Sequence, residues 1–189
     1  MAANKNTATK TGKDLWVEMS IREISTQAHF ADIAYSHLDP KAIVGTDVVF
    51  SSIHSFLSHC AMVSKMLKAD DGSTPTKTIG DVLGVAAGSS IHQRTFRNHL
   101  EHYDERLQLW INQFGPNVSI GAYNMGPKTA LKIPGFVFVR HYDPSTKVFT
   151  FVNDDFDLSA LHSEVQLIQG VADTWVRGME SGRIKPPFI

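Results

Sequence analysis

The chain has 189 residues, 42% of them hydrophobic, which is enough to bury one core and predicts a single domain. Its formal net charge of −1 at pH 7 argues against a general attraction to nucleic acid or to an acidic membrane surface, so any basic site must be a local patch. The single cysteine, Cys60, excludes an intramolecular disulfide and a zinc site built from several thiolates, and it indicates a reducing cytoplasm.

The first residues differ in composition from the rest of the chain. Residues 1–13 lack large apolar side chains and are predicted to form a flexible tail, which leaves residues 14–189 as the domain. The start has no apolar leader, and no later segment approaches the run of about 20 apolar residues that crosses a bilayer. We therefore expect a cytoplasmic protein without a membrane partner.

Two long amphipathic helices are predicted in the first part of the domain. Apolar residues recur at spacings of four and three over residues 14–38 and again over residues 49–67. The Asp39-Pro40 pair ends the first helix, and residues 45–47 begin the second. Cys60 belongs to the second apolar stripe, so we interpret it as a small buried side chain and not as a nucleophile.

The predicted third helix covers residues 90–114 and is the most informative part of the chain. Ser90 and Gln93 form a capping box at its start, and Gly115-Pro116 ends it. One face is apolar and is expected to pack on the core: it comprises Phe96, Leu100, Tyr103, Leu107, Trp110 and Phe114.

A β-hairpin at about residues 136–152 is predicted next, because two runs rich in aromatic and β-branched residues flank a turn. Asp157 then caps a last helix that keeps the four-three spacing as far as Met179. The predicted fold is mainly α: an up-and-down helical bundle of about four long helices, with the hairpin inserted between the third and the fourth.

The polar residues of the third helix suggest chemistry. Arg97, Asn98 and His102 form the pattern Arg-Asn-x-x-x-His, and Arg94 and Glu101 also lie off the apolar stripe. An arginine keeps its charge and presents a fork suited to phosphate, whereas a histidine can exchange a proton near neutrality. Together they can bind and cleave a phosphodiester without metal, and the asparagine can orient the histidine one turn on.

The motif from Arg97 to His102, inside a long helix, resembles the signature of the HEPN superfamily. The resemblance spans about residues 14–180 and implies a homodimer in which Arg97 and His102 of both chains line one cleft. Active HEPN proteins are metal-independent endoribonucleases, often toxins or phage-defence components. The resemblance therefore implies an RNA substrate, an antitoxin or operon partner, attack by the ribose 2′-hydroxyl, and neither a cofactor nor a metal.

Three other interpretations are open. Some HEPN proteins have lost catalysis and serve as dimerisation or partner-binding modules. The polar residues can also be a solvated face, in which a pair such as Arg97 and Glu101 contributes only about 0.2–0.5 kcal/mol. A carboxylate-bridged metal site would lack the Glu-x-x-His pairs that such bundles use, although these residues are available for one: His54, His59, His99, His102, Glu18 and Glu101.

Overall fold

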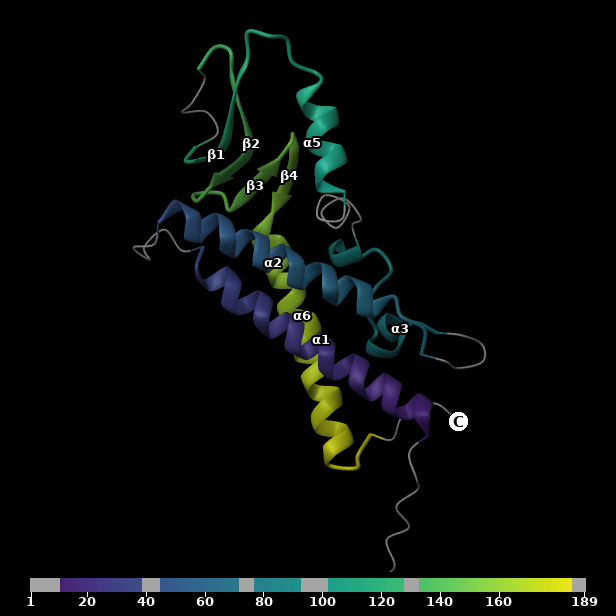
Figure 1. The fold of residues 1–189 in the computed structure, drawn as a ribbon. Coiled ribbons are helices and arrows are strands. Elements are labelled where there is room, and N and C mark those ends of the chain that lie inside the picture. The colour runs from purple at the N-terminus through teal and green to yellow at the C-terminus, as the bar shows by residue number, and fades with distance from the viewer. Residues whose placement is uncertain (1–10, 39–44, 72–76, 93–101, 128–132, 185–189) are drawn as a thin grey trace, which may run out of the picture.

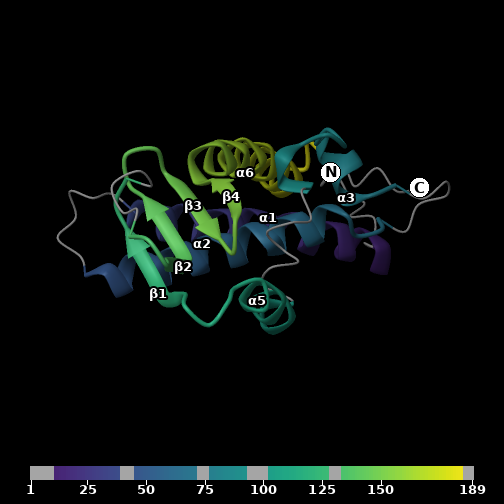
Figure 2. The ribbon, with the colours of Figure 1, turned by 90° about the horizontal axis from the view of Figure 1, so that it is seen from above.

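The computed structural model describes residues 11–38, 45–71, 77–92, 102–127 and 133–184. Long helices form a layer, and a β-sheet lies across one end of that layer with a shorter helix beside it (Figure 1). Seen from above, this shorter helix lies on the side of the layer away from the last helix (Figure 2). None of the helices within the described ranges is long and apolar enough to cross a membrane.

Three long helices make up the layer: α1 (Gly12–Ser36), α2 (Thr46–Leu67) and α6 (Leu158–Glu180). Their positions confirm the three apolar patterns predicted from the sequence. Helix α1 begins before Asp14, because Thr11 accepts a hydrogen bond from the Asp14 amide while the Asp14 carboxylate accepts one from the Thr11 amide.

The core between these helices is made of apolar side chains that are withdrawn from solvent. Its innermost side chains are at most 3% exposed: Val17, Ile21, Ile24, Ala28, Ile53, Phe56, Cys60, Val63, Val165, Ile168 and Ala172. The predicted burial of Cys60 is confirmed, and that burial raises the pKa of its thiol, so the group is held as an uncharged side chain.

A row of polar contacts fixes how α6 sits on α1. His162 Nε2 lies 2.7 Å from Asp32 Oδ1, and the imidazole stacks on the Tyr35 ring with centroids 3.8 Å apart. The Tyr35 hydroxyl lies 3.0 Å from the Ser159 hydroxyl. Because partly buried polar groups need partners, these contacts favour one register of the two helices over others.

The sheet has four strands in the order β1-β2-β3-β4: β1 (Ser119–Met125), β2 (Phe136–Asp143), β3 (Val148–Phe151) and β4 (Asp154–Asp157). Strand β1 pairs with β2 in parallel, and the other pairs are antiparallel. The β2–β3 pair is the predicted hairpin, which is confirmed. The predicted fold class is wrong, because helices flank a mixed sheet instead of forming an up-and-down bundle with an inserted hairpin.

Strand β1 lies at the edge of the sheet and contains a glycine that the packing needs. A Cβ atom at Gly121 would lie 2.7 Å from the Phe138 ring and 2.8 Å from the Phe136 ring. The glycine therefore allows both rings of β2 to lie against the edge strand. On the neighbouring helix, Phe50 joins α2 to the sheet, with ring centroids 5.0 Å from Tyr123 and 6.4 Å from Phe149.

The third predicted helix, residues 90–114, is not one continuous helix. Ser90–His92 form a turn of 3₁₀ helix, and a separate helix, α5, covers Tyr103–Ile111. Between them, His102 has φ −125° and ψ 41°, which is outside the helical region. Residues 93–101 lie outside the described ranges. A short helix, α3 (Ile79–Leu83), precedes this part of the chain.

Candidate functional site around His102

Helix α5 begins immediately after His102, the N-cap residue, whose side chain makes no capping hydrogen bond. The carboxylates of Asp104 and Glu105 lie in the first turn, where they complement the partial positive charge of a helix N-terminus. The His102 carbonyl accepts a hydrogen bond from the Arg106 amide at 3.1 Å. The backbone of His102 therefore starts the helix while its imidazole is left for other contacts.

The His102 side chain is 54% exposed, and its Nδ1 atom lies 3.6 Å from a carboxylate oxygen of Glu105. This separation exceeds a normal hydrogen bond and gives an ion pair only when the imidazole is protonated. An exposed imidazole beside a carboxylate is accessible to a ligand and can exchange protons with it.

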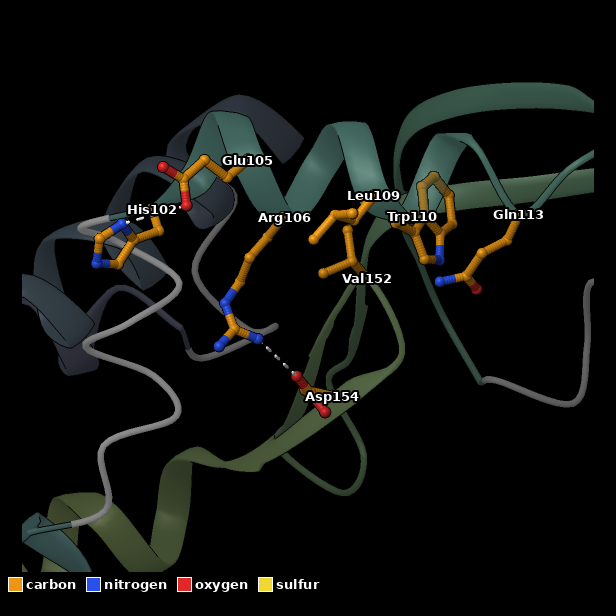
Figure 3. Close-up of a pocket in the computed structure, with 8 residues that line it drawn as sticks. All are labelled: His102, Glu105, Arg106, Leu109, Trp110, Gln113, Val152 and Asp154. Atoms are coloured by element: carbon orange, nitrogen blue, oxygen red, sulfur yellow. Dashed lines mark ion pairs between the residues drawn. The ribbon is translucent and has the colours of Figure 1, made fainter.

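His102 stands at one end of an open hollow with a volume of about 490 Å³ (Figure 3). The hollow is lined by α5, the residues around it, and the turn between β3 and β4: His102, Glu105, Arg106, Leu109, Trp110, Gln113, Val152 and Asp154. Arg106 Nη1 lies 3.9 Å from Asp154 Oδ2 across the hollow, and both side chains are partly exposed. Such a long, solvated pair contributes little and can open for a ligand.

Trp110 forms the apolar part of this hollow. Its side chain is 3% exposed and meets the Phe114 ring edge-on, with centroids 4.7 Å apart and planes at 79°. Leu109 is 67% exposed at the rim. The hollow therefore combines an aromatic and aliphatic wall with charged groups at its margin, which suits a ligand that is partly apolar and partly anionic.

The structure describes one of the five predicted site residues. His102 is described and is accessible to solvent. Arg94, Arg97, Asn98 and Glu101 lie outside the described residues. The roles of these four residues stay predictions.

Other residues of the hollow were not predicted to belong to a site. Trp110 was expected in the core, and it is buried, but it also lines the hollow. Asp154 comes from β4, a strand that the sequence pattern did not predict. The turn before β4 contains Val152 and Asn153 at φ 41° and 82°, so it is a tight turn of the kind that joins hairpin strands. In the sequence, Asn153 followed by two aspartates is a turn signal, but it does not predict that Asp154 lies near Arg106 of α5.

Two further features of the described residues bear on function. A second hollow, of about 310 Å³, lies between α1 and α2 and includes His37 and His59. His59 is partnered there, because its Nδ1 atom lies 2.7 Å from Gln27 Oε1. Within the described ranges, no three or more histidine, cysteine, aspartate or glutamate side chains gather as metal ligands would.

Comparisons of the chain with protein-family models, with curated proteins and with solved structures give no match.

Proposed function

We propose that the protein is a HEPN-like, metal-independent endoribonuclease in which Arg97 and His102 cleave RNA through the ribose 2′-hydroxyl. The observation that supports this most is the state of His102: its imidazole is 54% exposed, makes no capping hydrogen bond and stands at the edge of an open hollow. A histidine needed only for packing or capping would be covered or hydrogen-bonded.

The proposed reaction uses one proton relay and one cation. The 2′-oxygen forms a bond to phosphorus, the bond from phosphorus to the 5′-oxygen breaks, and the products carry a 2′,3′-cyclic phosphate and a 5′-hydroxyl. A proton leaves the 2′-hydroxyl and another reaches the 5′-oxygen, which is the work of His102. Arg97 stabilises the charge that develops on the phosphorane, while Asn98, Arg94 and Glu101 support the arrangement.

The proposal includes a homodimer, in which Arg97 and His102 of both chains share one cleft. Light scattering on the full chain tests this part directly. A dimer is expected at tens of micromolar, whereas a monomer at that concentration would remove the shared cleft. In the cell, such an enzyme would act as a toxin or defence effector under the control of an antitoxin or operon partner.

The test of the activity is incubation of the purified chain with a mixed RNA pool in excess EDTA. We expect cleavage that His102→Ala and Arg97→Ala each abolish. Two matched controls remove exposed residues elsewhere: His29→Ala on α1 and Arg177→Ala on α6 should cut like the parent. Thermal unfolding of each variant checks the fold. Absence of cutting by the parent, or full activity of His102→Ala, would refute the enzyme.

A second candidate is a catalytically inactive HEPN-like module that dimerises or binds a partner. The exposed apolar side chains of α5 favour it, since Leu109 is 67% and Ile111 41% exposed on the same short helix. This candidate predicts a dimer or complex that Leu109→Glu weakens, without any RNA cleavage. A dimer that Leu109→Glu leaves intact would count against an interface on α5.

A further inference from the structure

Arg140 on β2 joins the sheet to the start of α5. Its Nη2 atom donates a hydrogen bond to the Tyr103 hydroxyl at 2.5 Å. Its Cζ atom lies 5.1 Å from the Tyr103 ring centroid and 5.9 Å from that of Phe151, and these two rings stack on each other with centroids 5.1 Å apart. The guanidinium therefore lies against the stacked rings of Tyr103 and Phe151, and Tyr103 is the residue that follows His102 in the chain.

The charge of Arg140 has no carboxylate partner in the described part of the chain. The side chain is partly buried, and its one hydrogen bond there goes to a neutral phenol. A guanidinium has five N–H donors, so most of them are left for water or a ligand. Arginine that is withdrawn from water is usually paired with an anion, and its planar fork matches two oxygens of a phosphate.

One other side chain, Tyr103, can complete an anion site at Arg140. The Tyr103 oxygen accepts a hydrogen bond from Arg140, so the phenol hydrogen is left to donate to another oxygen. His54 on α2 is partly buried, and its pKa is lowered by burial and then by the charge of Arg140. The imidazole of His54 is therefore a reporter of the charge at Arg140.

We propose that Arg140 and Tyr103 bind a phosphate group. The two residues lie on β2 and α5, and neither belongs to the Arg97–His102 motif, although Tyr103 follows His102 directly. That the phosphate is part of an RNA backbone, next to the phosphate that is cleaved, is an inference that rests on the proposed function. The affinity for phosphate itself follows from the two side chains and stands without that function.

The test is a titration of the full chain with inorganic phosphate, followed by NMR of the histidine rings. Binding brings negative charge to Arg140, so the His54 signals should shift in a saturable way and the pKa of His54 should rise. His59 is an internal control on the same helix, because burial alone lowers its pKa and its partner is Gln27. Equal, non-saturating shifts of both histidines would overturn the site.

Variants give the second arm of the test. Arg140→Gln should weaken phosphate binding about tenfold or more, the loss typical of a charged hydrogen-bonding partner. Arg140→Lys should bind with intermediate affinity because it keeps the charge and loses the fork. Tyr103→Phe should also weaken phosphate binding, and Tyr35→Phe is its matched control, since Tyr35 also loses a hydrogen bond, to Ser159 at 3.0 Å, between α1 and α6. Unchanged affinity of Arg140→Gln would overturn the proposal.

The source of the phosphate is settled with a 2′-deoxy oligonucleotide, which cannot be cleaved through a 2′-hydroxyl. If the oligonucleotide binds more tightly than inorganic phosphate, and Arg140→Gln removes this binding, the site belongs to a nucleic-acid backbone. If inorganic phosphate binds more tightly, the site belongs to a free phosphate ligand. Phosphate binding without RNA cleavage would refute the nuclease and keep the site. RNA cleavage with unaltered KM in Arg140→Gln, together with no phosphate binding, would refute the site and keep the nuclease.

Discussion

The helical layer and the region of α5 are built in opposite ways. In the layer, α1, α2 and α6 share a core whose inner side chains are at most 3% exposed. In α5, Trp110 is the one buried residue of the helix, and the polar links to the sheet include the Arg140–Tyr103 hydrogen bond and the 3.9 Å pair of Arg106 and Asp154. Most of the surface of α5 faces solvent.

This difference separates stability from chemistry. A residue in the layer contributes through burial, so its loss weakens the whole fold. An exposed residue on α5 contributes little to burial and is free to meet a ligand, as functional residues on surface elements commonly are. The candidate site lies on a region that contributes few buried side chains to the fold.

The largest expected effect is a loss of stability from a change in the layer. Phe56→Ala removes a fully buried ring and should lower the free energy of unfolding by about 3–5 kcal/mol. Urea denaturation measures this, with Leu109→Ala on α5 as the matched control, for which we expect a change within about 0.5 kcal/mol. Equal losses in the two variants would show that α5 belongs to the same core.

A smaller effect, confined to α5, is expected for Trp110→Ala. With the main apolar anchor of α5 removed, its amides should exchange with solvent about tenfold faster or more, which needs a local loss of only about 1.4 kcal/mol. Amides of α1 and α2 should keep their protection. Hydrogen exchange followed by mass spectrometry measures the protection of α5 and of the layer separately. Ile111→Ala, at an exposed position, is the control. Loss of protection throughout the chain would contradict the division into two regions.

The smallest effect is a dependence of stability on pH to which two histidines of α2 contribute. Burial lowers the pKa of His54 and of His59, and Arg140 lowers that of His54 further. The folded chain then binds fewer protons than the unfolded chain, so its stability should fall as the pH drops below about 6.5 toward the lowered pKa values. His54→Gln should flatten this dependence in urea denaturation at several pH values. An unchanged slope in this variant would contradict the burial of His54.

The sequence predicted the three helices of the layer well, because apolar residues that repeat at spacings of four and three indicate an amphipathic helix. It also predicted the cap of α6 correctly: the Asp157 carboxylate accepts a hydrogen bond from the Ala160 amide at 2.9 Å. The pattern failed where pairing is not local. Strand β1 has a glycine and alternates weakly, and its parallel partner β2 is separated from it by other residues. Strand β4 has three aspartates and one apolar residue, so its composition resembles a loop.

The prediction of the site was limited for a related reason. A spacing of four and three fits one long helix through residue 102 as well as it fits a short helix that begins at Tyr103. The acidic first turn at Asp104 and Glu105 is the signal that marks the true start. The pair of Arg140 and Tyr103 could not be predicted, because these residues come from two elements that meet only in the folded chain.

The most direct measurement of the central claim compares two substrates of the same base sequence, one RNA and one with 2′-deoxyribose throughout. Both are incubated with the full chain in excess EDTA, and the ends of the products are determined. We expect the RNA to be cut to products with 2′,3′-cyclic phosphate ends and the deoxy substrate to stay intact. Cleavage of both substrates, or of neither, would contradict it.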